Sequence, residues 1–417
     1  MKHAFTVEAD PGKKRFQDGT HRLIPPSETL KKVTPLLSAM GITRVANVTG
    51  LDRIGVPVIM VTRPNARSIA VSQGKGLTLE AAKASGVMEA IEIFHAEHIQ
   101  HPLKFASYND MRSSHGHDND RDLVDLDRLA ELASSRYHPD LTMLWIEGHD
   151  LLNQRQLWLP FETIHTNFTL PSPPGASSFS PSTNGLASGN HLLEATCHAI
   201  FEVIERDAIT LWRARGDLVD LTRLDLGTVV DPACREVLRR LDEAGLEIAA
   251  FDATSDLGIP VFYATLLDRR FEQSHPGIGA GCHLAPEVAL LRALTEAIQV
   301  RMTYITGARD DLTPDEFTDL GRAKKLDPVQ RLMREIQPSR SFHETTSPPQ
   351  GKTFADDLAF LLERLDAAGI EQVVAVDLTK PAFNVAVVKV VIPGLEDADD
   401  HDGYIPGPRA VAPEARS

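Results

Sequence analysis

The sequence predicts a mixed α/β fold, and three observations support this expectation. Segments with the apolar spacing of helices alternate along the chain with short runs rich in Val and Ile. The composition is that of a globular protein, with 42% hydrophobic and 24% charged residues in a chain of 417, which is long enough for one large domain or two to three subdomains. One pattern, a glycine followed by a helical stretch, also occurs three times. Such mixing is typical of α/β or α+β folds.

The elements follow from these patterns in chain order. Helical spacing is found in residues 27–42, 77–100, 187–208, 234–248, 285–305 and 356–370. Strand-like runs occur as a pair within 44–65 and singly in 141–152, 156–168, 249–255, 260–268, 372–379 and 386–395. We expect a polar loop at 107–122, a loop dense in Pro, Ser and Gly at 171–190, and a polar linker between the last two helices.

Charge and composition exclude several classes of function. The formal net charge is −15, which disfavours attraction to nucleic acid or anionic lipid. The sequence has neither an apolar run long enough to span a bilayer nor a secretory signal, so we expect a cytoplasmic protein with no membrane partner. The three cysteines are far apart and are interpreted as small buried hydrophobic residues: Cys197, Cys234 and Cys282.

The repeated pattern carries grouped carboxylates. Its copies begin at Gly76, Gly189 and Gly281, and each helix contains a polar step of three residues: Glu89 to Glu92, Glu202 to Glu205 and Glu296 to Gln299. At about 100° per residue, Asn190, Glu202 and Glu205 fall on one flank of the apolar stripe of the second helix. Partial burial of such carboxylates is costly unless a cation lies among them.

Each glutamate alone is explained as a solvated helix residue, but the repetition indicates a hard divalent cation or a complex of Mg²⁺ with a nucleotide. Lys75 in SQGKG, Asn190, Arg206 and Arg292 are candidate phosphate or metal-shell contacts. A P-loop is absent. An iron pair is the weaker alternative, because only one Glu-x-x-His step occurs, at Glu92. The run His95, His98 and His101 is interpreted as a solvated helix end.

Several of these segments resemble one known family. The stretches SQGKG with MEAIE, SGNHLLEATCHAIFEVIERDA, and GCHLAPEVALLRALTEAIQVR with ITGARDDL are similar to those of the YcaO-domain proteins, and VVKVVIPGLE resembles their late strand. RIGVPV, RPNARS and GARDD resemble the subgroup that works with TfuA-like proteins. The resemblance implies a single catalytic YcaO domain within 1–417, covering about 14–410, with 396–417 forming an acidic and then Pro-rich tail.

The resemblance also implies a reaction. Members of the family use ATP and Mg²⁺ to transfer the γ-phosphoryl group to the oxygen of a peptide backbone amide. A neighbouring Cys, Ser or Thr then gives an azoline, whereas a sulfide equivalent gives a thioamide. The TfuA-associated subgroup implies a thioamide on a peptide or protein substrate, a sulfur donor, and a TfuA-like partner acting in trans. No side-chain nucleophile is implied, in agreement with the lack of a convincing Ser/His/Asp or Cys/His set.

The resemblance assigns roles to individual residues. It implies that Mg²⁺ is held by Glu89, Glu92, Glu194, Glu202 and Glu205. It implies nucleotide or metal-shell contacts at Asn190 and Arg206, with Lys75, Arg292 and Gln299 also at the ATP site. Arg22 and Thr29 in GTHRLIPPSET have the spacing of an N-terminal basic and hydroxyl pair that reaches the nucleotide.

The end of the chain departs from the azoline-forming members. Those often end in a Pro-rich tail whose carboxylate lies in the active site, whereas this sequence ends in PEARS. This difference favours the thioamide. An azoline-forming cyclodehydratase and a nucleotide-binding scaffold without turnover stay open as alternatives, as do the substrate, the sulfur source and a homodimeric state.

Overall fold

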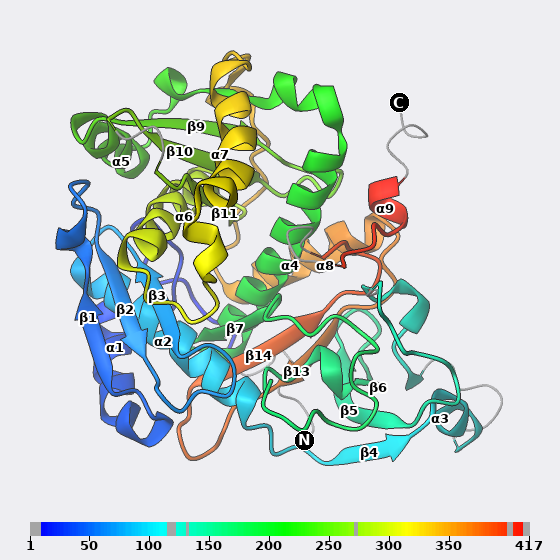
Figure 1. The fold of residues 1–417 in the computed structure, drawn as a ribbon. Coiled ribbons are helices and arrows are strands. Elements are labelled where there is room, and N and C mark those ends of the chain that lie inside the picture. Colours follow the sequence, from blue (N-terminus) through cyan, green and yellow to red (C-terminus); the bar gives the residue numbers. More distant parts are fainter. Residues whose placement is uncertain (1–9, 115–121, 131–132, 271–273, 398–402, 412–417) are drawn as a thin grey trace. The chain divides into compact units, whose positions relative to one another are not determined.

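The computed structural model describes residues 10–114, 122–130, 133–270, 274–397 and 403–411. The chain divides into two compact units. Unit 1 is formed by residues 1–13, 91–214 and 351–417, and unit 2 by residues 14–90 and 215–350. Each unit mixes helices with strands (Figure 1), which confirms the predicted fold class. The prediction of one catalytic domain over residues 14–410 stays a prediction.

Unit 1 is built on a six-stranded antiparallel sheet. The strand order is β4-β5-β13-β14-β7, and β6 pairs with β5. The strands are β4 (Leu103–Ala106), β5 (Met143–Asp150), β6 (Arg155–Pro160), β7 (Leu186–Gly189), β13 (Val374–Asp377) and β14 (Ala386–Val391). The Val-rich sequence of β14, which lies between β13 and β7, suits its burial, because Val387, Val388 and Val390 are at most 1% exposed.

Helix α4 (Leu192–Ala214) packs against β7 and β14 of this sheet and against α8 (Phe354–Ala367) (Figure 1). Its apolar stripe includes Ile200 and Ile204, both fully buried. A capping box formed by Thr353 and Asp356 starts α8. The short helix α9 (Pro408–Val411) also contacts α4. The sheet and α8 therefore hold α4 on two sides.

Unit 2 contains two three-stranded antiparallel sheets, ordered β1-β2-β3 and β11-β10-β9. The strands are β1 (Arg44–Asn47), β2 (Val58–Thr62), β3 (Val71–Lys75), β9 (Leu246–Asp252), β10 (Val261–Asp268) and β11 (Gly277–Cys282), with β8 (Leu224–Asp225) and β12 (Arg340–Ser341) as a short parallel pair. The helices are α1 (Pro26–Val33), α5 (Pro232–Glu243), α6 (Pro286–Thr306) and α7 (Asp319–Arg334). Helix α2 (Leu79–Glu97) contributes residues up to Ala90 to unit 2 and the remainder to unit 1.

The three copies of the repeated pattern are three strand-to-helix segments: β3 with α2, β7 with α4, and β11 with α6. The third copy shows why glycine is required. Gly277, Gly279 and Gly281 alternate along β11 and face α6 so closely that a Cβ atom on Gly279 would lie 2.2 Å from the carbonyl oxygen of Ala293. Small residues on both elements therefore permit contact between strand and helix backbones.

Two helices contradict the expectations from sequence. Helix α3 (Tyr108–Ser114) occupies part of the predicted loop 107–122, because Ser107 and Asp110 form reciprocal hydrogen bonds at its start. Helix α7 occupies part of the predicted polar linker. Its buried apolar residues, Leu326, Val329 and Met333, are few among charged side chains, so their spacing is a weak signal. Across the described ranges, we find no helix both long and apolar enough to cross a membrane.

Candidate functional site

In unit 1 the predicted metal ligands lie on α2 and α4. Glu92 on α2 accepts hydrogen bonds from the backbone nitrogen of Ser188, at 2.7 Å, and from its hydroxyl, at 2.6 Å. Ser188 belongs to β7, the strand that leads into α4. These two hydrogen bonds fix the Glu92 carboxylate against the start of the second repeat.

The carboxylates of α4 are buried or half-buried. Glu194 and Glu205 are 2% and 3% exposed, and Glu202 is half-buried. The Arg206 guanidinium lies 3.6 Å from the Glu205 carboxylate. Burial of carboxylates at this level requires nearby positive charge, and Arg206 supplies part of it.

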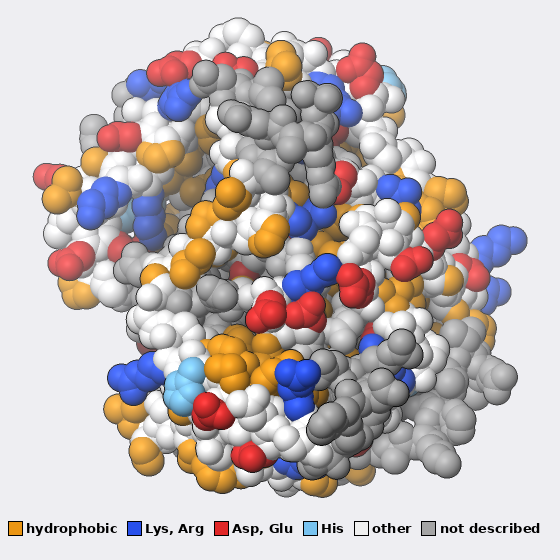
Figure 2. Space-filling model, turned by 90° about the vertical axis from the view of Figure 1, so that its right-hand side faces the viewer, with side chains coloured by type: hydrophobic (Ala, Val, Ile, Leu, Met, Phe, Trp, Pro, Cys, Tyr) orange, Lys and Arg blue, Asp and Glu red, His pale blue; other side chains and the backbone are white. Residues whose placement is uncertain are grey.

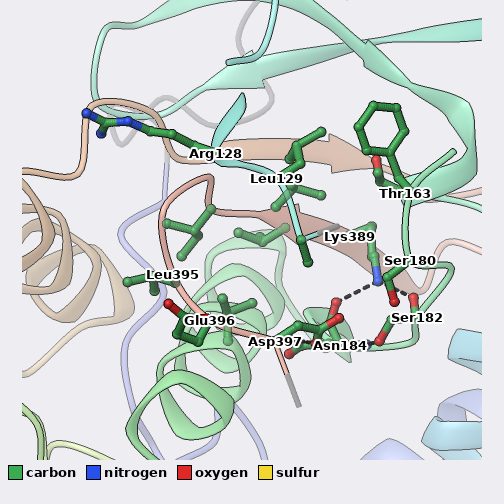
Figure 3. A pocket seen from close by; sticks show the side chains of 16 residues that line it. Arg128, Leu129, Thr163, Ser180, Ser182, Asn184, Lys389, Leu395, Glu396 and Asp397 are labelled. Carbon is green, nitrogen blue, oxygen red and sulfur yellow. Dashed lines mark hydrogen bonds between the residues drawn. The ribbon is translucent and has the colours of Figure 1, made fainter. Parts of the chain in front are cut away.

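Lys389 on β14 supplies further positive charge. Burial lowers the pKa of its ammonium group to about 8, while Glu202 and Asp397 act in the opposite direction. The group donates hydrogen bonds to the backbone oxygens of Ser182 and Asn184, at 2.5 and 2.6 Å (Figure 3). Its position on a Val-rich strand gave no indication of this role, so Lys389 was not predicted.

The pocket shown in Figure 3 borders this lysine. Its volume is about 70 Å³, whereas pockets for small-molecule ligands measure roughly 300 Å³ or more. Its lining includes Thr163, Asn184, Val203 and Glu396. We therefore do not assign it to a nucleotide.

In unit 2 the predicted residues Lys75 and Glu89 lie in one charged cluster with Glu296 and Arg309. Lys75 at the end of β3 forms an ion pair of 2.6 Å with Glu296 on α6. Burial raises the pKa of Glu89 to about 7, although Arg309 and Lys75 act against the rise. Glu296 was part of the repeated polar step but was not predicted as a site residue. This part of unit 2 therefore combines two carboxylates with two cationic side chains.

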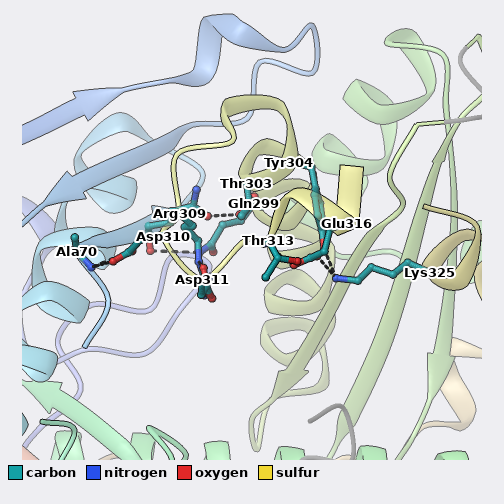
Figure 4. A network of polar contacts seen from close by, with 11 residues as sticks. Ala70, Gln299, Thr303, Tyr304, Arg309, Asp310, Asp311, Thr313, Glu316 and Lys325 are labelled. Carbon is teal, nitrogen blue, oxygen red and sulfur yellow. Dashed lines mark hydrogen bonds and ion pairs between the residues drawn. The ribbon is translucent and has the colours of Figure 1, made fainter. Parts of the chain in front are cut away.

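The segment after α6 holds Arg309 in place (Figure 4). Asp310 accepts a hydrogen bond from the backbone nitrogen of Ala70 at 3.0 Å, and Arg309 is paired with Asp311 at 2.9 Å. In the same view Gln299 donates to the backbone oxygen of Gln73, at 3.3 Å. These contacts tie the GARDD motif to the loop before β3, and α6 to β3 itself.

Four predicted site residues remain to be placed: Arg22, Thr29, Asn190 and Arg292. In unit 2, Arg22 is half-buried and pairs through its backbone with Phe16, and the half-buried Arg292 lies on α6. Thr29 is 5% exposed, and its hydroxyl donates within α1 to the Pro25 oxygen, at 3.4 Å. In unit 1, Asn190 is half-buried between β7 and α4.

The twelve predicted residues thus divide equally between the units. Unit 1 contains Glu92, Asn190, Glu194, Glu202, Glu205 and Arg206, and unit 2 contains Arg22, Thr29, Lys75, Glu89, Arg292 and Gln299. Among the residues that the structure describes, no group of three or more His, Cys, Asp and Glu side chains is arranged to hold a metal ion. The carboxylate donors do fit the oxygen preference of Mg²⁺. Their assignment to one site stays a prediction.

The histidines that follow Glu92 differ from expectation. His95 is fully buried, and its Nδ1 lies 2.7 Å from the backbone oxygen of Ile91. Its ring meets Phe383 edge to face, with a centroid distance of 5.9 Å. The interpretation of the histidine run as a solvated helix end is therefore wrong for His95, because this side of α2 faces the interior of unit 1. The cysteine prediction is confirmed, because all three side chains are buried.

On the described part of the face in Figure 2, acidic and basic side chains are interspersed. The prediction that nucleic acid is not a partner rests on the net charge of −15 and stays a prediction.

These features define an α/β protein in which glycine-bearing strands lead into helices with grouped, partly buried glutamates. The family described as "YcaO cyclodehydratase, ATP- and Mg²⁺-binding" matches residues 73–396. The chain belongs to the YcaO family, which confirms the resemblance and the prediction of ATP and Mg²⁺ as cofactors.

Two relatives extend this result. An uncharacterized protein in the tfuA 3′ region of Rhizobium leguminosarum bv. trifolii is 35% identical over 408 residues, covering 94% of this chain and 92% of the relative. An uncharacterized protein of Methanothermobacter thermautotrophicus is 34% identical over 378 residues, covering 89% of this chain and 94% of the relative. The first relative supports membership of the TfuA-associated subgroup.

Solved structures share the fold. YcaO from Methanopyrus kandleri bound with AMPPCP and Mg²⁺ has a TM-score of 0.71 at 24% identity, covering 92% of this chain and 95% of its own. A heterocyclase in complex with substrate and cofactor has a TM-score of 0.74 at 23% identity, and the match covers 93% of this chain. This chain spans 54% of the length of that heterocyclase.

Proposed function

We propose that this protein uses Mg²⁺ and ATP to activate a backbone amide of a peptide by phosphorylating the amide oxygen. The observation that carries the proposal is the set of glutamates on α2 and α4, within the region matched by the family. Carboxylate oxygens are ligands suited to Mg²⁺. When bound, Mg²⁺ and ATP supply the phosphoryl group and neutralise the charge that spreads during its transfer.

The protein's own residues prepare this site. Ser188 orients the Glu92 carboxylate through two hydrogen bonds. Arg206 stabilises the buried Glu205, and the buried ammonium of Lys389 stabilises Glu202. Nearby positive charge favours the ionised form of a carboxylate, which is the form that binds a metal ion. Positioning and electrostatic stabilisation are the main requirements of phosphoryl transfer, so no protein nucleophile is needed.

We propose a thioamide as the product, made with a TfuA-like partner. The γ-phosphoryl group forms a bond to the amide oxygen and leaves ADP. A sulfide equivalent then attacks the carbonyl carbon, the C–O bond breaks, and phosphate leaves with the original oxygen. The net change replaces oxygen by sulfur at the expense of one ATP. The relative encoded in a tfuA 3′ region supports the partner.

The azoline product is the second candidate, because the matched family is described as a cyclodehydratase. Both reactions share the activation step and differ in the nucleophile. Mass spectrometry separates them, because thioamide formation replaces one oxygen by sulfur and azoline formation removes one water. Phosphate release that depends on the peptide would exclude a scaffold without turnover.

Calorimetric titration with ATP, with and without Mg²⁺, tests the site. Wild type should bind ATP in a Mg²⁺-dependent manner, and Glu202→Gln should lose this binding while it keeps its fold. Glu80→Gln is the matched control, because Glu80 is exposed on the first turn of α2. Equal Mg²⁺-dependent binding by wild type and Glu202→Gln would contradict the assignment of Glu202.

A further inference from the structure

A buried ion pair fastens segment 403–411 to helix α4 within unit 1. The guanidinium of Arg409 donates two hydrogen bonds to the Asp207 carboxylate, from Nε at 2.9 Å and from a terminal nitrogen at 3.0 Å. The Asp207 side chain is fully buried, and that of Arg409 is 10% exposed. A bidentate pair of this kind fixes the relative orientation of its two groups. The pair therefore restrains how α4 lies against the segment as well as how close it lies.

Glu396 makes a second connection between the same elements. Its carboxylate is 5% exposed and accepts a hydrogen bond from the Tyr404 hydroxyl at 2.7 Å. It also accepts from three backbone nitrogens within residues 407–410, at 2.8 to 3.0 Å. The backbone nitrogen of Glu396 donates to the Asp207 carboxylate at 3.0 Å. Two buried carboxylates, one of them on α4, are thus held by the same short segment.

The contacts continue from here to the predicted metal ligand Glu202. Asp397, the next residue along the chain, accepts a hydrogen bond from the Asn184 side chain at 2.9 Å. The backbone oxygen of Asn184 accepts from the Lys389 ammonium at 2.6 Å (Figure 3). That ammonium interacts electrostatically with both Asp397 and Glu202. A connected set of contacts therefore runs from segment 403–411 to Glu202.

Asp207 lies on the other side of α4 from the predicted metal ligands. At about 100° per residue, it is about 140° around the helix from Glu202 and about 160° from Glu205. Thr210, close to one turn further along α4, donates its hydroxyl to the backbone oxygen of Asp397 at 2.8 Å. These two attachments oppose rotation of the helix about its axis. A buried ion pair adds little net stability compared with apolar packing, and its best attested use is to specify one arrangement.

We propose that Asp207 and Arg409 are positioning residues that fix the orientation in which α4 presents Glu202 and Glu205 to Mg²⁺. The inference rests on the proposed function, in which these two glutamates hold the metal ion. It gives a pair on the far side of α4 a role at the site, and it makes segment 403–411 a part of what the protein needs to bind Mg²⁺-ATP.

Calorimetric titration of the full-length protein with Mg²⁺-ATP tests this role in Arg409→Met. We expect Kd to rise by about tenfold to a hundredfold, as for the loss of groups that orient metal ligands. Arg409→Lys keeps the charge without the bidentate geometry and should bind with intermediate affinity. Arg128→Met is the matched control, because it removes an exposed ion pair of unit 1, with Glu371, and should bind like wild type.

The titrations are made at a temperature at which circular dichroism shows each variant to be folded. A purely structural role for the pair then predicts a lower thermal midpoint with an unchanged Kd. Equal Kd values in wild type and Arg409→Met would therefore overturn the inference. Where Arg409→Met does not fold, equal values in wild type and Arg409→Lys would do so.

Hydrogen exchange of the backbone amides of residues 202–206 separates the inference from the proposed function, because it needs no nucleotide. We expect faster exchange in Arg409→Met than in wild type, and wild-type exchange in Arg128→Met. A wild type that does not bind Mg²⁺-ATP would contradict the proposed function, and exchange alone would then decide the inference. Faster exchange in Arg409→Met would support the positioning of this part of α4, and equal exchange would overturn it.

Discussion

Asp268, at the end of β10, belongs to a network of ion pairs. Its carboxylate accepts from Arg53 at 2.8 Å and from Arg301 at 3.0 Å, and Arg301 also pairs with Asp52 at 2.8 Å. The Asp268 side chain is fully buried and that of Arg301 is 9% exposed. These pairs fasten the turn that contains Asp52 and Arg53 to α6 and β10.

Asp268→Asn should lower the free energy of unfolding by about 2 kcal/mol, because Arg53 loses its carboxylate partner and the buried Arg301 keeps only Asp52. Urea denaturation measures this change. Asp242→Asn is the control, because the pair of Asp242 with Arg269 is exposed and should contribute at most about 1 kcal/mol. Equal losses in both variants would show that the buried network is not a particular source of stability.

His21 predicts a dependence of stability on pH. Burial lowers its pKa to about 4 from 6.5, helped by Lys14 and Arg22. Between these values the unfolded chain binds a proton that folded His21 does not, so the unfolding free energy decreases as pH falls from 6.5 to 4. One group shifted this far contributes about 3 kcal/mol over the window. His283, which shifts in the same direction, adds to it.

Denaturation at several pH values within this window tests the contribution. His21→Asn should show a shallower decrease in stability with falling pH than wild type. About two pH units above 6.5 the unfolded histidine is deprotonated as well, so there His21 contributes no slope in wild type. An unchanged slope in His21→Asn would mean that other groups account for the acid sensitivity and that His21 is not held neutral by its surroundings.

At the scale of elements, close packing of β11 on α6 depends on glycine. A Cβ atom on Gly279 would meet the Ala293 oxygen at 2.2 Å and the Ala297 nitrogen at 2.4 Å. Gly279→Ala should therefore destabilise the protein by about 3 kcal/mol, at the upper end of overpacking effects. Gly50→Ala is the control, because its Cβ would meet nothing within 4 Å. Similar thermal midpoints for the two variants would show that the two elements can separate at little cost.

Much of this architecture could be predicted from local pattern. The repeated glycine followed by a helix indicated the segments β3 with α2, β7 with α4, and β11 with α6, because spacing and glycine act locally. Helix α3 was missed although Ser107 and Asp110 have the spacing of a capping box. Helix α7 was missed because its apolar face is narrow.

Less of the candidate site than of the fold could be predicted from the sequence. The carboxylates could be found because they recur within the three copies. Lys389 could not, because it has no local signal and becomes buried only when distant segments pack together.

At the scale of the whole molecule, ligand binding should appear as added stability. A ligand that binds only the folded protein stabilises it by about 2.7 kcal/mol when its concentration exceeds Kd about a hundredfold. The protein carries a net charge of −15, so ATP without a cation must approach a strongly acidic molecule. Mg²⁺ lowers the charge of the nucleotide and can bridge it to carboxylates.

ATP with Mg²⁺ should therefore raise the thermal midpoint of wild type, and ATP with a chelator should raise it less. Glu202→Gln should show no shift that depends on Mg²⁺, whereas Glu80→Gln should respond like wild type. The thermal midpoint with Mg²⁺ alone, measured in parallel, gives the stabilisation that the cation provides without nucleotide. An equal rise with ATP in the presence and absence of Mg²⁺ would mean that the nucleotide binds through cationic side chains alone. The grouped glutamates would then need another explanation, as carboxylates compensated by Arg206 and Lys389 to hold α4 in unit 1.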